Sequence, residues 1–117
     1  MKKKILVVDD EKNLRILYEE ELKAENYDVD IADSAEAAFS YLDKEDYDVI
    51  VLDIQMPGMS GLEAMGHILH RNRKQAIILN TAYSQFKDDF KSWSADAYIV
   101  KSGDLTELKE KIKELVG

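Results

Sequence analysis

The sequence predicts an α/β domain in which helices cover both faces of a parallel sheet. Short apolar runs, typical of strands buried on both faces, alternate with longer segments whose apolar residues recur at helical spacing. At 117 residues the chain is long enough to bury a core without disulfides, and it contains no cysteine. We therefore expect one domain over residues 1–117.

Five short segments are predicted as strands. Four of them are continuous apolar runs, whereas the second alternates charged and apolar residues, a pattern typical of a half-exposed edge strand. The predicted strands are residues 5–8, 28–31, 49–52, 76–79 and 97–100.

A helix is predicted after each strand, from apolar residues three or four positions apart. Ser34 and Ser60 are predicted to cap the second and third helices. Asp104 and Glu107 are predicted to cap the fifth, and Asn26 to end the first. Apolar stripes of this kind usually face the core. The five stripes are Leu14, Leu17, Tyr18 and Leu22; Ala35, Ala38, Phe39 and Leu42; Leu62, Met65 and Leu69; Phe86, Phe90 and Trp93; and Leu105, Leu108, Ile112 and Leu115.

Strict alternation of strand and helix implies parallel strands joined by right-handed crossovers. Five such units are too few for a closed barrel, which needs eight. Buried first, third and fourth strands with an exposed second strand fit the flavodoxin-like order 2-1-3-4-5. The sequence therefore predicts a doubly wound (βα)5 fold with a five-stranded parallel sheet.

Polar residues follow four of the predicted strands: Asp9 and Asp10, Asp53, Thr81, and Lys101. Because the carboxyl ends of parallel strands meet at one edge of the sheet, we expect these residues to converge. Clustered carboxylates repel one another, and Mg²⁺ relieves that repulsion while keeping coordination positions for phosphate oxygens. The hydroxyl and the lysine indicate a phosphoryl group between metal and lysine. Asp53, at the end of the predicted central strand, is the best candidate for a nucleophile that forms an aspartyl phosphate.

Four motifs stand at these strand ends: Val-Val-Asp9-Asp10-Glu11, Val-Leu-Asp53-Ile-Gln-Met-Pro-Gly-Met-Ser-Gly, Thr81-Ala-Tyr and Tyr98-Ile-Val-Lys101. Together, and in this order, they resemble the receiver domain of two-component response regulators. The resemblance covers essentially the whole chain. It implies a phosphorylation-dependent signalling switch that catalyses its own phosphorylation and hydrolysis and is not a metabolic enzyme.

The resemblance also assigns the acidic residues. Asp53 would accept a phosphoryl group from a phosphohistidine of a sensor kinase or a phosphotransfer protein. Asp10 and Asp53 would ligate Mg²⁺ together with the backbone carbonyl of Gln55. Asp9 would act mostly through bound water.

The remaining roles follow from the same resemblance. Thr81 would hydrogen-bond one phosphoryl oxygen, and Lys101 would pair with another. Tyr98 would swing inward as Thr81 moves, which would reshape the surface of the fourth helix, fifth strand and fifth helix.

The composition and the resemblance bear on partners and location. A formal net charge of −8 argues against direct binding of nucleic acid or an anionic membrane, and no apolar run approaches the length of a spanning helix. The resemblance implies a histidine kinase or phosphotransfer protein as donor, a downstream effector or fused output domain, and a cytoplasmic location. Homodimerisation on phosphorylation is one outcome the sequence allows. Leu14 stays open between a core role and the kinase-docking surface that the family often forms there.

Three positions differ from, or vary within, the family pattern. The family usually has proline after the lysine, often with a cis bond, whereas Ser102 follows here. A cis bond to serine would cost about 2.5–4 kcal/mol, so we expect a trans peptide with an altered loop or a strained exception. By the resemblance, Gln55 and Tyr83 occupy positions beside the phosphosite that vary across the family. Tyr83 is predicted to shield the acyl phosphate partly from water.

Three other kinds of protein are weighed against this interpretation. Haloacid-dehalogenase-like phosphohydrolases also use an aspartyl phosphate, but they carry a second Asp where this chain has Gln55. A pure interaction module would not need the complete acidic set. A flavin-binding flavodoxin would need a phosphate cradle after the first strand, where this chain is acidic.

Overall fold

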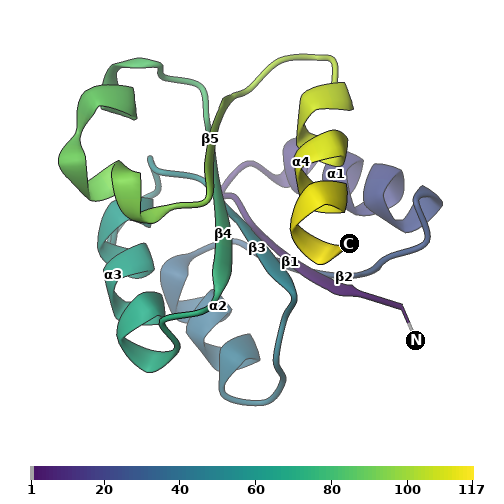
Figure 1. Ribbon diagram of the computed structural model, residues 1–117, viewed down its shortest axis with the longest axis horizontal. Coiled ribbons are helices and arrows are strands. Elements are labelled where there is room, and N and C mark those ends of the chain that lie inside the picture. The colour runs from purple at the N-terminus through teal and green to yellow at the C-terminus, as the bar shows by residue number, and fades with distance from the viewer. Residues whose placement is uncertain (1) are drawn as a thin grey trace.

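The computed structural model describes residues 2–117, except for the side chains of Phe90 and Lys91. Over these residues the chain forms a parallel sheet, flanking α-helices and two short 3₁₀ segments (Figure 1). The elements are β1 (Lys4–Val8), α1 (Lys12–Ala24), β2 (Asp28–Ala32), α2 (Ala35–Leu42), β3 (Val49–Leu52), α3 (Gly61–Arg71), β4 (Ala76–Thr81), η1 (Gln85–Asp88), η2 (Phe90–Ser94), β5 (Ala97–Val100) and α4 (Thr106–Val116).

The sheet confirms the predicted topology. Its order is β2-β1-β3-β4-β5, and every neighbouring pair is parallel. β3 lies at the centre, between β1 and β4, and all four of its residues are buried. Asp53 follows β3 directly, so the acidic residue leaves the sheet at its middle.

Two apolar cores lie on opposite faces of the sheet. On one face α1 and α4 contribute Tyr18, Leu22, Leu108 and Ile112, and Leu14 packs against this core from α1. On the other face α2 and α3 supply the helical residues (Figure 1). Leu17, predicted as part of the buried stripe of α1, is instead 38% exposed.

The predicted helix signals are borne out at three ends. Ser34 Oγ accepts the Ala37 N–H at 3.1 Å, and Ser60 Oγ accepts the Glu63 N–H at 3.2 Å. Asn26 adopts φ 70°, the left-handed conformation that Asn tolerates just past a helix.

The start of α4 differs slightly from its prediction. Asp104 Oδ1 accepts the Thr106 N–H at 2.9 Å, but the helix itself begins at Thr106. Asp104 therefore closes the turn that leads into α4.

The helix predicted between β4 and β5 is wrong. The segment forms η1 and η2 instead, and Trp93, predicted as core, is 72% exposed. Phe86 is half-buried against the core, whereas the prediction for the Phe90 side chain lies outside the described residues.

Ser92 gives a physical reason for this difference. Its hydroxyl is buried and lies 2.9 Å from the Phe86 carbonyl oxygen and 2.7 Å from the Asp89 carbonyl oxygen. Backbone bonds join Ser92 N–H to Asp89 and Ala95 N–H to Ser92, three residues apart. A serine hydroxyl that occupies backbone acceptors competes with α-helical hydrogen bonds, so tighter turns replace the helix.

In the described part of the chain, no helix has both the length and the apolarity that a membrane crossing requires.

Candidate phosphoacceptor and metal site

Three carboxylates meet at the carboxyl ends of β1 and β3. One oxygen from each of Asp9, Asp10 and Asp53 lies within 4.8 Å of the others. Asp9 and Asp53 are 1% and 5% exposed, whereas Asp10 is exposed to solvent. The structure therefore brings together the acidic residues that the sequence placed at two strand ends.

Lys101 bridges two of these carboxylates. Its Nζ lies 2.7 Å from Asp9 Oδ2 and 3.1 Å from Asp53 Oδ2, and its side chain is 11% exposed. Burial lowers the pKa of Lys101. The hydrogen bond to Asp9 and the charges of both carboxylates raise it by more than burial lowers it, so the pKa of Lys101 lies above its ordinary value. Lys101 is therefore a fixed cation in the site.

Burial raises the pKa of Asp53 above its ordinary value. The charge of Lys101 and its hydrogen bond oppose this shift, while the neighbouring Asp9 adds to it. Desolvation thus outweighs the single lysine, and the site as it stands favours additional positive charge.

Thr81 ends β4 and is fully buried. Its Oγ1 accepts the Tyr83 N–H at 3.4 Å, and its carbonyl accepts the Lys101 N–H at 2.7 Å. The second bond ties the ends of β4 and β5 together, so Thr81 and Lys101 are held side by side.

The loop after β3 is fixed by a close backbone approach at Gly61. A Cβ at Gly61 would stand 2.0 Å from the Asp53 carbonyl oxygen, and the Gly61 N–H donates to the Ile54 carbonyl at 2.7 Å. Gln55 is exposed, and its N–H lies 3.4 Å from Asp53 Oδ1. Only glycine fits where the start of α3 meets the end of β3.

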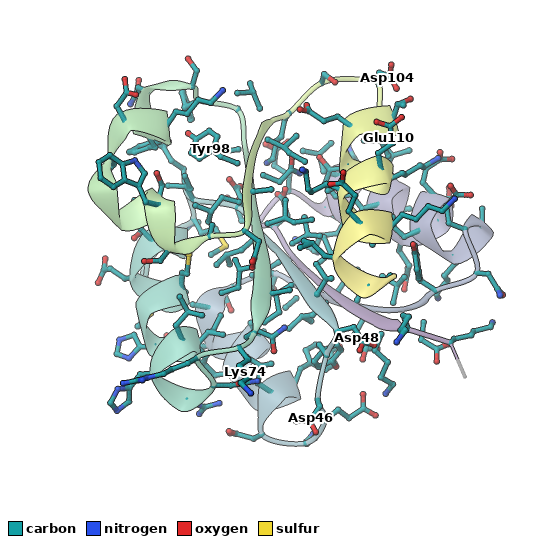
Figure 2. The ribbon with its side chains drawn as sticks, viewed as in Figure 1. Asp46, Asp48, Lys74, Tyr98, Asp104 and Glu110 are labelled. Carbon is teal, nitrogen blue, oxygen red and sulfur yellow. The ribbon has the colours of Figure 1, made fainter. Side chains whose placement is uncertain are left out.

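Tyr98 is half-buried on β5 and packs against the core, and its side chain lies between this strand and the η1–η2 segment (Figure 2). Its hydroxyl donates to the backbone carbonyl of Tyr83, two residues beyond Thr81. Tyr83 itself is 44% exposed and meets Phe86 edge-on, with ring centroids 6.5 Å apart. Tyr98 is therefore connected to the loop that follows Thr81.

The Lys101–Ser102 peptide bond is trans, as is every peptide bond in the described residues. Ser102 Oγ lies 2.8 Å from the Asp104 carbonyl and 3.3 Å from the Asp104 amide nitrogen. A serine-closed turn therefore replaces the proline turn, which is the first of the two expectations for this loop.

Two further contacts beside the site were not predicted. Arg15 Nη1 donates to the Asp9 carbonyl at 2.7 Å. Asn80 Nδ2 donates to the Tyr18 hydroxyl at 3.0 Å, and both residues are buried. Helical spacing placed Tyr18 in the apolar stripe of α1. The one sequence signal of its hydrogen bond was Asn80, a polar residue that directly follows a buried apolar run and so needs a buried partner.

The donor set suits a hard divalent cation. Carboxylate oxygens with room for water are the ligands that Mg²⁺ takes, and the described cluster offers three of them within reach of one another. The raised pKa of Asp53 points in the same direction, because a cation would stabilise its ionised form.

Comparison with known proteins defines the family. The family described as response regulator receiver domain matches residues 5–113. The chain belongs to this family, which forms the regulatory receiver domains of two-component systems.

Relatives of known structure share the whole fold. The response regulator TrrA from Thermotoga maritima, solved in complex with Mg²⁺-BeF, is 50% identical with a TM-score of 0.93, over 97% of this chain and 98% of that one. A complex of the histidine kinase ThkA with TrrA matches with a TM-score of 0.92 at 50% identity, over 98% of this chain and 99% of that one.

Among curated sequences, the response regulator ArlR of Staphylococcus saprophyticus is 39% identical over 115 residues, which is 97% of this chain and 52% of ArlR. The chain thus spans about half the length of the curated relatives it matches.

Proposed function

We propose that this chain is a phosphorylation-dependent switch in which Asp53 accepts a phosphoryl group from a phosphohistidine. One observation carries the proposal. Asp53 is a buried carboxylate at the end of the central strand, between an acidic pair and a lysine that already contacts it at 3.1 Å. A carboxylate nucleophile that stands among cation-binding groups can form an acyl phosphate.

The transfer needs no group beyond the two proteins and a cation. An oxygen of Asp53 forms a bond to phosphorus and the phosphorus–nitrogen bond to imidazole breaks. The imidazole nitrogen keeps that electron pair, and a proton from solvent water makes the leaving imidazole neutral. Asp10, Asp53 and the Gln55 carbonyl would hold Mg²⁺, with Asp9 acting through water. The cation would offset negative charge on the transferring phosphoryl group.

The other residues act on the product. Lys101, now paired with Asp9 and Asp53, would move onto a phosphoryl oxygen, and the Thr81 hydroxyl would donate to another. The Tyr98 hydroxyl donates to the carbonyl of Tyr83, which is two residues after Thr81. A shift of Thr81 would therefore move the group that Tyr98 binds. The output surface would then be η1, η2, β5 and α4, which correspond to the elements predicted from the sequence. Tyr83 would shield the acyl phosphate.

The proposed donor is a histidine kinase or a phosphotransfer protein. The kinase complex of TrrA supports this partner, because TrrA is 50% identical to this chain. The output would pass to an effector protein or a fused domain, with homodimerisation as an alternative readout. We propose no direct contact with nucleic acid or membrane, in line with the net charge of −8. The chain as one domain over residues 1–117, and a cytoplasmic location, stay predictions.

The proposal is tested by incubation with Mg²⁺ and phosphoramidate, followed by intact-protein mass spectrometry. We expect a gain of one phosphoryl group per chain, which is lost in Asp53→Asn and in EDTA. Asp46→Asn, an exposed carboxylate at the far end of the molecule from Asp104 in Figure 2, is the matched control and should label normally.

Two other results would redirect the interpretation. Turnover of many equivalents of donor without accumulated label would indicate a phosphohydrolase. An absence of both label and turnover in the wild-type chain would indicate an interaction module.

A further inference from the structure

The start of α1 lacks the usual local support. Glu11 occupies the N-cap position, and among the described residues its side chain makes no capping hydrogen bond. The first turn contains no acidic residue, and Lys12 places a positive charge at the helix end where the macrodipole disfavours it. The helix beginning therefore depends on groups outside the helix.

Asp9 supplies part of that support. Its Oδ1 accepts the Glu11 N–H at 2.9 Å, and its carbonyl accepts Arg15 Nη1 at 2.7 Å. The Arg15 backbone N–H donates to the Glu11 carbonyl at 3.0 Å, which places Arg15 in the first turn of α1. From there its guanidinium extends toward the residues that precede the helix. Asp9 is thus fastened to α1 through both its side chain and its backbone.

Asp10, the next residue, has no such contact. Its side chain is exposed, and among residues 2–117 no hydrogen bond or ion pair holds it, although its carboxylate belongs to the acidic cluster. The direction of that carboxylate is therefore set by the backbone of the β1–α1 loop. A hydrogen bond from a charged donor is stronger than a neutral one. Arg15 therefore restrains the backbone of this loop, while Lys101 pairs with the Asp9 carboxylate.

We infer that Arg15 is a positioning residue, which holds the β1–α1 loop so that Asp10 faces Asp53 as a cation ligand. The inference rests on the proposed Mg²⁺ site and adds a residue to it. Groups that orient metal ligands typically change metal affinity 10–100-fold when they are removed.

Removing Arg15 would change the affinity for Mg²⁺ in two opposite ways, one through its charge and one through the position of Asp10. A cation near the acidic cluster repels Mg²⁺, so on charge alone its removal would tighten binding. If Arg15 positions Asp10, its removal weakens binding instead. The sign of the change therefore separates a positioning role from a nearby charge.

We would titrate Mg²⁺ into the metal-free chain by calorimetry and compare Arg15→Met with Lys12→Met. Lys12 is exposed at the same end of α1, and among the described residues its side chain has no hydrogen bond or ion pair, so Lys12→Met removes the same charge without removing a polar contact. We expect the Kd of Arg15→Met to rise about tenfold and that of Lys12→Met to stay unchanged or fall. An unchanged or lower Kd in Arg15→Met would overturn the inference.

A second measurement needs no metal. Amide exchange followed by NMR reports the Glu11 N–H, which bonds to Asp9. We expect Arg15→Met to speed exchange of this amide at least tenfold while amides of β3 keep their rates, which also shows that the variant is folded. Unchanged Glu11 exchange would overturn the positioning role. Failure of the wild-type chain to bind Mg²⁺ would instead count against the proposed function, and the exchange result would still decide on Arg15.

Discussion

Asp53 combines two requirements that conflict in the metal-free protein. As the proposed nucleophile it must be ionised, yet its burial disfavours the ionised form and raises its pKa, and Lys101 offsets this only in part. Between the unfolded and the folded pKa, the native state binds more protons than the unfolded chain. Stability therefore falls as pH rises through that window, and Asp53 destabilises the fold above it.

We predict that Asp53→Asn raises the free energy of unfolding in EDTA at neutral pH. Asparagine removes the buried charge, while Lys101 keeps its 2.7 Å contact with Asp9. The gain should shrink as pH falls toward about 3.9, the ordinary pKa of an unfolded Asp, because both states of the wild type then bind the proton. Urea unfolding across this pH range measures it.

In Mg²⁺ the wild type should become more stable to unfolding than Asp53→Asn, because the cation stabilises the Asp53 carboxylate and not the asparagine amide. Asp46→Asn serves again as the exposed control and should show neither the gain nor the reversal. A less stable Asp53→Asn variant at neutral pH in EDTA would contradict this account of the buried charge.

At the scale of elements, the junction of β3 and α3 holds Asp53 in place. α3 begins at Gly61, with its backbone against the Asp53 carbonyl, and Ser60 caps the helix. The junction leaves no room for a side chain at Gly61.

We predict that Gly61→Ala lowers the free energy of unfolding by about 1–3 kcal/mol, as expected when an atom is forced into a packed site. It should also slow labelling of Asp53, because the carbonyl that must move belongs to that residue. Gly66→Ala in the same helix is the control. Open space surrounds Gly66, so alanine there should stabilise by up to about 1 kcal/mol. Equal effects at the two positions, measured by urea unfolding, would show that the close approach does not matter.

The η1–η2 segment shows where periodicity fails as a guide to an element. Phe86 and Trp93 stand at helical spacing, but the buried Ser92 hydroxyl binds backbone carbonyls that an α-helix would use. The direction of one hydroxyl decides between the two structures, and sequence spacing does not encode it. Trp93 consequently lies on the surface.

At the scale of the whole molecule, the site is a product of topology. Asp9, Asp53, Thr81 and Lys101 are far apart in sequence, and parallel pairing of β1, β3, β4 and β5 brings their strand ends to one edge. Strand order and convergence could be predicted because both follow from the alternation of apolar runs.

The contacts of Arg15 and the Tyr18–Asn80 pair could not be predicted in the same way. They depend on where long side chains turn after the backbone is placed. Arg15 sits at an ordinary surface spacing on α1, and nothing in its neighbours distinguishes it from a solvated cation.

The most direct test of the central claim is to locate the phosphoryl group. After labelling with phosphoramidate and Mg²⁺, borohydride reduction converts an aspartyl phosphate to homoserine, and peptide mass spectrometry identifies the converted residue. We predict conversion at Asp53 and none at Asp9 or Asp10. Conversion at either of those residues, or labelling that persists in Asp53→Asn, would contradict a site in which Asp53 is the nucleophile and its neighbours hold the cation.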